Sequence, residues 1–128
     1  MLPSSWRING GTETMNIVKE TLDSQVLYTL VDNKLKLTVG KATLTDFNGV
    51  ARLHTIYVKA EFRGRGYGER LMKKIIEDMG CKPIYLSTHY GGIKFFKRYD
   101  FEVKYGRPEE FSTLVEMVRE PSKTRYHR

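Results

Sequence analysis

Hydrophobic and polar residues alternate along the first half of the chain, which predicts a series of β-strands. The alternation is clearest over residues 26–31 and 35–44, and residues 32–34 between them are of types that form turns. A third alternating run, residues 50–58, follows Asn48-Gly49, and an Asn-Gly pair between two such runs is a strong hairpin signal. We therefore expect these three runs to pair as neighbouring antiparallel strands.

The hydrophobic period changes after the third run. The apolar residues there are spaced as on one face of a helix, with charged residues between them; they are Leu71, Met72, Ile75, Ile76 and Met79. Gly80 is expected to end this helix. The remaining pattern predicts a strand over residues 83–88, a short helix over 91–99, and strands over 101–105 and 111–120.

Residues 15–22 fit two structures. Val18 and Leu22 are four residues apart, as on a short helix, but the segment also fits a first strand that pairs with the next one. With either assignment, the order of elements predicts an α/β or α+β fold. Its centre would be a mixed, mainly antiparallel sheet with helices packed on it in three layers.

A glycine-rich loop, Arg63-Gly64-Arg65-Gly66-Tyr67-Gly68, joins the third run to the long helix. Its glycines allow positive φ angles and a close approach of the backbone to a ligand. The free N–H groups at the start of the helix, the helix dipole and the two arginines favour a phosphate or diphosphate there. The alternative is a glycine-rich turn with solvated arginines. A P-loop is not indicated, because Glu69 and Arg70 stand where it needs Lys and Ser or Thr.

The loop also resembles a known family. The pattern Arg63-x-x-Gly66-x-Gly68, after a strand that ends in Ile56-Tyr57-Val58, is similar to motif A of the GCN5-related N-acetyltransferases (GNAT). Residues 93–102 resemble the helix-four signature of that family, and residues 114–119 resemble its closing strand. The resemblance covers residues 26–120 and implies one acetyltransferase domain over residues 1–120, followed by a basic tail over 121–128.

The resemblance implies a cofactor and a reaction. An acetyl group would pass from acetyl-CoA to a primary amine of a protein, peptide or small molecule by direct attack. The loop amides would bind the diphosphate, and the pantetheine arm would pair with the strand backbone. The cofactor-binding residues implied are Ile56, Tyr57, Val58, Arg63, Gly64, Arg65, Gly66, Tyr67, Gly68, His89 and Phe96; no residue is assigned to a metal.

Three residues are candidates for proton transfer. An alkylammonium group has a pKa near about 10.4, so the amine needs a base at neutral pH. Some family members carry a histidine on the strand that ends at Val58, so His54 is the candidate base. Strand alternation would place it on the same face as Ile56 and Val58. For the general acid the family often uses a tyrosine on helix four, where this chain has Phe96, so Tyr99 and Tyr90 are the candidates to replace it. Each of these residues could instead have only a structural role.

Composition narrows the setting of the protein. The 128 residues suit one domain, and a lone cysteine, Cys81, cannot form an internal disulfide, which suggests a reducing, cytoplasmic location. No apolar run is long enough to cross a membrane, and the first residues do not resemble a signal peptide. The net charge of +7 suggests an anionic partner. Two alternatives to the amine acetyltransferase remain. Phe96, in place of the tyrosine of the family, suggests an acyl-CoA-binding module with little turnover. The basic charge suggests an enzyme that acetylates a nucleic-acid-linked amine such as aminoacyl-tRNA. A homodimer could complete the acceptor pocket, because few residues precede the strands.

Overall fold

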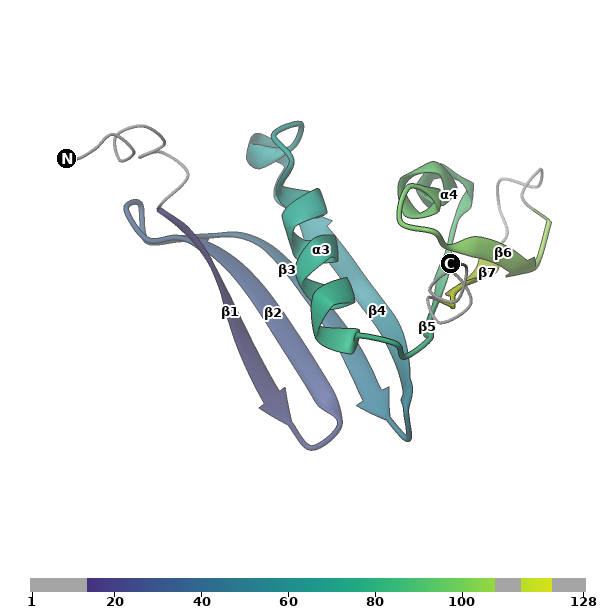
Figure 1. Cartoon of the computed structure of the whole chain (residues 1–128). Helices are drawn as coiled ribbons and strands as arrows, with labels where there is room; N and C mark the ends of the chain where they lie inside the picture. Colours follow the sequence, from purple (N-terminus) through teal and green to yellow (C-terminus); the bar gives the residue numbers. More distant parts are fainter. Residues whose placement is uncertain (1–13, 108–113, 121–128) are drawn as a thin grey trace, which may run out of the picture.

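The computed structural model of the chain describes residues 14–107 and 114–120. Within these residues one seven-stranded sheet has the strand order β1-β2-β3-β4-β5-β7-β6 (Figure 1). The strands are β1 (Met15–Leu22), β2 (Gln25–Asp32), β3 (Leu37–Phe47), β4 (Val50–Val58), β5 (Ile84–Thr88), β6 (Glu102–Tyr105) and β7 (Val115–Arg119). The helices are the 3-10 turn η1 (Ala60–Phe62), α3 (Tyr67–Met79) and α4 (Tyr90–Lys97).

The first four strands form an antiparallel meander. Residues 15–22, for which helix and strand were both open, form strand β1, and Met15 lies opposite Asp32 of β2. The Asp32 carboxylate accepts hydrogen bonds from the N–H groups of Lys34 and Leu35, which stabilises the turn between β2 and β3. At the next turn Asn48 and Gly49 have φ angles of 55° and 78°. The two predicted hairpins are therefore confirmed, and each is fixed by local turn chemistry.

The sheet changes character between β4 and β5. These two strands run parallel, whereas every other pair in the sheet is antiparallel, so the predicted mixed, mainly antiparallel sheet is confirmed. Their pairing covers only two positions, Ala51 with Ile84 and Arg52 with Tyr85. Beyond these positions β4 and β5 diverge and form a fork.

Both helices pack on one face of the sheet. Leu71, Met72 and Ile75 of α3 are fully buried, and Ile93 and Phe96 of α4 join them in one hydrophobic core with the inward residues of the strands. The part of the chain that the structure describes therefore has two layers, and the predicted third layer is not found in it. We call the opposite, helix-free side of the sheet the outer face.

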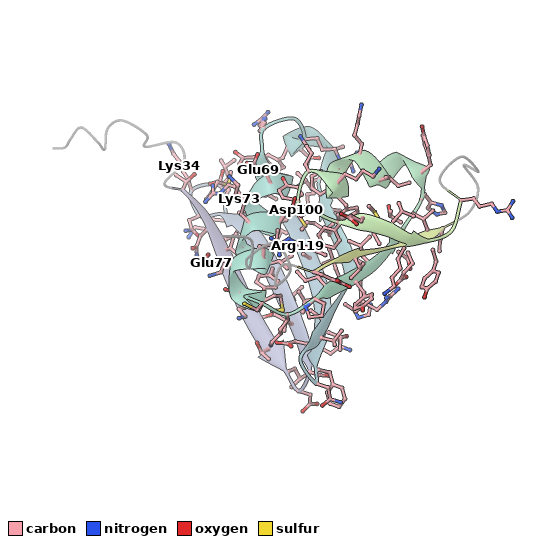
Figure 2. The ribbon with its side chains drawn as sticks, turned by 45° about the vertical axis from the view of Figure 1, so that its right-hand side comes forward. Lys34, Glu69, Lys73, Glu77, Asp100 and Arg119 are labelled. Atoms are coloured by element: carbon pink, nitrogen blue, oxygen red, sulfur yellow. The ribbon has the colours of Figure 1, made fainter. Side chains whose placement is uncertain are left out.

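The exposed side of α3 carries its charged residues. Figure 2 shows Glu69, Lys73 and Glu77 along this side, and the Lys73 ammonium lies 2.8 Å from the Glu69 carboxylate one turn away. Gly80 ends the helix as predicted, with a φ of 61° and its N–H bonded to the Ile76 carbonyl. The charged residues that lie between the apolar ones in the predicted helix therefore face water.

Some boundaries differ from those predicted. Helix α4 ends at Lys97 rather than at residue 99, because the chain turns at Asp100, which has a φ of 71°. An aspartate tolerates this left-handed conformation better than most residues. Part of the predicted last strand, residues 111–113, and the basic tail over 121–128 lie outside the described residues.

Candidate active site

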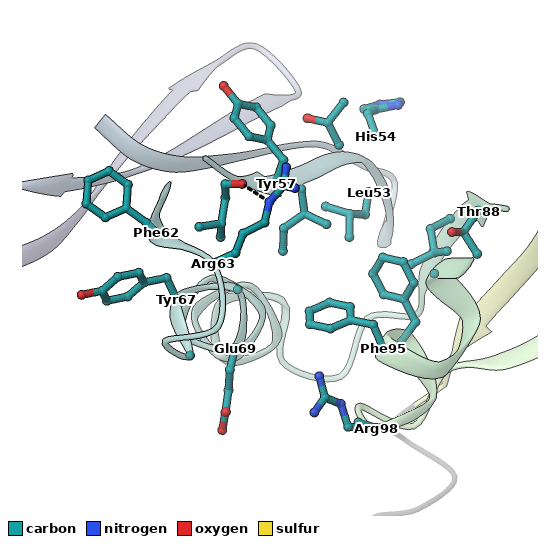
Figure 3. A pocket seen from close by; sticks show the side chains of 18 of the residues that line it. Leu53, His54, Tyr57, Phe62, Arg63, Tyr67, Glu69, Thr88, Phe95 and Arg98 are labelled. Carbon is teal, nitrogen blue, oxygen red and sulfur yellow. Dashed lines mark hydrogen bonds between the residues drawn. The ribbon is translucent and has the colours of Figure 1, made fainter. Parts of the chain in front are cut away.

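The fork between β4 and β5 opens into a cleft of about 760 Å³ (Figure 3). Its walls come from β4, the loop before α3, the first turn of α3, β5 and α4. It exists because β4 and β5 stop pairing after Arg52 and Tyr85. From Leu53 onward, the edge of β4 that faces β5 has no neighbouring strand within the described residues.

A β-bulge in β4 determines which side chains face each side of the cleft. The register shifts between Thr43 and Leu44 of β3: Leu44 lies opposite Leu53, and Thr43 lies opposite Thr55, so His54 is the extra residue. Leu53 and Ile56 therefore both face the core, although they are three residues apart, and the outer face carries His54 and Thr55 in succession.

This bulge corrects the predicted orientation of His54. Ile56 and Val58 pack against the core, whereas His54 is exposed on the outer face. Its Nε2 lies 2.7 Å from the Thr45 Oγ1 on β3. Simple alternation failed here because one extra residue reverses the faces of all that follow. His54 nevertheless lines the cleft, from its outer side.

The glycine-rich loop forms the end of the cleft next to α3. Gly66 is the N-cap of the helix, with a φ of 85°, and Gly64 has a φ of 80°. A Cβ atom added at either glycine would have no other atom within 4 Å, so the space beside the backbone is open. The first N–H groups of a helix have no intrahelical acceptor, and here they lie beside that space. The loop therefore fits a diphosphate, which combines negative charge with several acceptor oxygens.

The two loop arginines have different surroundings. The Arg63 Nε donates a hydrogen bond of 2.8 Å to the Val58 carbonyl, which braces the loop against the end of β4 (Figure 3). The Arg65 guanidinium lies over the Phe62 ring at 5.8 Å and is not among the residues that line the cleft. Arg63 thus stabilises the conformation of the loop and also contributes a positive charge to it.

Aromatic residues of α4 form the opposite wall. Phe96 is 8% exposed and packs on Phe95 and Phe101, with ring centres 5.1 and 5.7 Å apart. The ring of Phe95 faces Gly68 at the start of α3, where an added Cβ would lie 3.6 Å from it. This wall is apolar, and the side chain of Phe96 has no proton to donate.

The other predicted residues in and next to α4 do not line the cleft. Tyr90 and His89 are exposed, and His89 occupies the N-cap position of the helix without a capping bond from its side chain. Tyr99 packs against Phe95, and burial, with a smaller effect of the Glu69 carboxylate, raises the pKa of its phenol. The roles predicted for these three residues remain predictions that the cleft geometry does not favour.

The cleft also contains residues that the sequence did not single out. Arg98, just after α4, lies over the Phe95 ring at 5.3 Å, and Thr88 is covered by the first turn of α4 at Gly92. A Cβ at Gly92 would collide with the Thr88 hydroxyl, so a larger residue there would force the Thr88 side chain to move. Ser87 of β5 lines the cleft on the outer face and is bonded to Arg52 and Glu116. No local pattern marks this last group, because its members are far apart in sequence.

Comparison with known proteins agrees with this geometry. Residues 23–103 match the model of the acetyltransferase (GNAT) domain, which is more than half of the chain. No curated protein sequence matches the chain. No helix in the described ranges has the length and apolar character needed to span a bilayer.

Solved structures of GNAT proteins share the fold. GCN5 from Tetrahymena is 20% identical with a TM-score of 0.64, over 77% of this chain and 69% of its own. The ribosomal-protein-S18-alanine N-acetyltransferase from Escherichia coli is 16% identical with a TM-score of 0.67, over 78% of this chain and 71% of its own. The PaiA N-acetyltransferase from Thermoplasma acidophilum, in complex with coenzyme A, is 18% identical with a TM-score of 0.62. That match covers 76% of this chain and spans 61% of the Thermoplasma chain. Together with the domain match, the split sheet and the glycine-rich loop show that this chain belongs to the GNAT acetyltransferase family.

Proposed function

We propose that this protein is an N-acetyltransferase that transfers an acetyl group from acetyl-CoA to a primary amine by direct attack. The proposal rests on one observation: two features that suit coenzyme A lie in the same cleft. An open cradle of helix N–H groups at Gly66 lies at one end, and the unpaired edge of β4 runs along one side. The first suits the diphosphate of coenzyme A, and the second suits an extended pantetheine arm with amide groups.

The backbone of β4 determines how such an arm would lie. The Val58 carbonyl already accepts a bond from Arg63, and the Val58 residue is paired with Gly40 on the other side. The predicted contact of pantetheine with Val58 must therefore share that carbonyl, which has two lone pairs. Ile56 and Tyr57 are the other backbone contacts that we propose for the arm.

The reaction needs a base for the acceptor. The base first takes a proton from the alkylammonium form of the acceptor and passes it to water. The free amine nitrogen then attacks the thioester carbonyl carbon, the carbon–sulfur bond breaks with its electrons on sulfur, and one further N–H proton leaves to the base. His54 is our proposed base, since it lines the cleft from the outer face and is held by Thr45. Exposure of its ring lets the proton pass on to water.

The apolar wall around Phe96 favours one alternative. The thiolate formed in the reaction needs a proton or a hydrogen bond, and neither Tyr90 nor Tyr99 lines the cleft. A module that binds acyl-CoA and turns it over slowly would have such a wall. A nucleic-acid-linked acceptor, a cytoplasmic location and a homodimer remain predictions from composition and from the short amino-terminal segment.

Product analysis tests the proposal. The purified chain is incubated with acetyl-CoA and a panel of primary amines: n-butylamine, spermidine, trialanine and Nα-acetyl-lysine amide. Thiol release and the mass of the acetylated amine are measured together. Acetylated product with matching thiol release would support the transferase. Tight binding of coenzyme A without amine-dependent thiol release would favour the binding module.

A further inference from the structure

Three side chains join the two sides of the fork on the outer face. Arg52 belongs to the last paired position of β4, Ser87 to β5 and Glu116 to β7. The Arg52 guanidinium donates to both Glu116 carboxylate oxygens, at 2.7 and 3.0 Å, and to the Ser87 hydroxyl at 2.8 Å. The bridge therefore forms where the backbone pairing of β4 and β5 ends.

The Ser87 hydroxyl already takes part in two hydrogen bonds. Its only hydrogen goes to the Glu116 carboxylate, at 2.9 Å, because a carboxylate cannot donate. One of its two lone pairs accepts the bond from Arg52. A single lone pair is left, and Ser87 is an exposed residue in the cleft lining. To a ligand in the cleft, this hydroxyl can act only as an acceptor.

The charges of the bridge fix this arrangement. The hydrogen bonds from Arg52 hold the pKa of Glu116 below its usual value, although burial opposes the shift. The same contact raises the pKa of Arg52. Both groups therefore stay ionised across the neutral range, and the Ser87 hydrogen keeps pointing toward Glu116.

We propose that Ser87 is the substrate-binding residue that holds the acceptor amine, by accepting one of its N–H hydrogens, with Arg52 and Glu116 as positioning residues. This inference rests on the proposed amine acetylation. With one N–H held by Ser87, the amine lone pair is free to turn toward the thioester carbon.

The number of hydrogens on the amine nitrogen determines which amines can react in this arrangement. The amine that attacks is the free base, formed when the ammonium gives its first proton to the base and through it to water. A free primary amine has two hydrogens: one leaves to the base as the new carbon–nitrogen bond forms, and the other stays on the amide product and on Ser87. The electron pair of the broken carbon–sulfur bond goes to sulfur, which takes up a proton. A secondary amine has one hydrogen, so it cannot bind Ser87 and also supply the proton that leaves. The cleft should therefore select primary amines over their N-methyl analogues.

Kinetics on matched amines test this inference. For the best primary amine of the panel above and its N-methyl analogue, KM and kcat are measured for the wild type and for Ser87→Ala. We expect Ser87→Ala to raise the KM for the primary amine about five- to tenfold and to lower the preference over the N-methyl amine by a similar factor. The affinity for coenzyme A, measured by calorimetry, should not change, which also shows that the variant is folded.

Three further variants separate positioning from simple stabilisation. Ser87→Thr retains the hydroxyl and should restore much of the preference. Glu116→Gln can donate to Ser87, which would free the hydroxyl hydrogen, so it should lower the preference while Ser87 is still present. Thr29→Val removes an outer-face hydroxyl on β2, which does not line the cleft, and serves as the control that should leave the preference unchanged.

The outcomes distinguish this inference from the proposed function. If the wild type acetylates no primary amine of the panel, the proposed function fails and the inference fails with it. If the wild type is active and Ser87→Ala leaves both KM and the preference unchanged, the role of Ser87 is overturned and the acetyltransferase stands.

Discussion

Gly66→Val tests the glycine-rich loop, and Gly49→Val is its matched control. Both glycines have positive φ, 85° and 78°, and an added Cβ would meet no atom within 4 Å at either. Each substitution therefore costs about 1–2 kcal/mol of folding free energy through backbone strain alone. In a domain of this size that lowers Tm by about 4–8 °C. Gly49 lies in the turn between β3 and β4, which is not part of the cleft.

The two variants should differ in cofactor affinity. At Gly66 the new side chain fills the space beside the first N–H groups of α3. If two charge-assisted hydrogen bonds to the diphosphate are lost, at about 1.5 kcal/mol each, the Kd for coenzyme A rises about 100-fold. Calorimetry with coenzyme A measures this, and thermal unfolding checks that both variants fold. Equal Kd values for Gly66→Val and Gly49→Val would refute the assignment of the diphosphate to this loop.

Three other substitutions test the site and the core. His54→Ala should lower turnover at pH 7 with little change in coenzyme A affinity, and an unaltered pH–rate profile would exclude its role as base. Phe96→Tyr should raise turnover, because it puts a phenol into the cleft wall; equal or lower turnover would show that protonation of the thiolate is not limiting. Asp78→Asn should lower stability at pH 7 by about 1–2 kcal/mol, since the carboxylate accepts a 2.9 Å bond from the buried Tyr28 hydroxyl. Burial pushes the pKa of Asp78 up, but the bonds from Tyr28 and Lys19 leave it below its usual value. A lowered folded-state pKa means that the stabilisation is present at neutral pH and disappears as the pH falls through that value. The difference between wild type and Asp78→Asn in urea unfolding should therefore shrink at acidic pH, and a constant difference would contradict this account.

The parts of the fold that depend on local chemistry were predictable from sequence. The Asn48-Gly49 turn and the end of α3 at Gly80 each follow from one or two adjacent residues. The glycine-rich loop belongs to the same class, because its conformation depends on Gly64 and Gly66 themselves. Such features need no knowledge of distant partners.

Two features of the site that failed or were missed depend on pairing between strands. The outward orientation of His54 comes from a register shift against β3, which alternation within β4 cannot reveal. The Arg52–Glu116 contact joins residues that are 64 positions apart. In the sequence, neither the arginine nor the glutamate belongs to a motif that would mark the two as partners. The outer side of the cleft was therefore the part that the sequence could not describe.

The bulge and the fork together give the cleft two different sides. Before the bulge, Leu53 faces the helices, and after it Ile56 does the same, so the helix side of β4 stays apolar beside the diphosphate cradle. The outer side receives His54 and Thr55 together, across the fork from Ser87. Direct transfer needs a donor and an acceptor that meet at one point without blocking each other. An apolar side with a phosphate cradle and a polar outer side with a hydroxyl acceptor suit a coenzyme and an amine that approach from opposite faces of the same sheet.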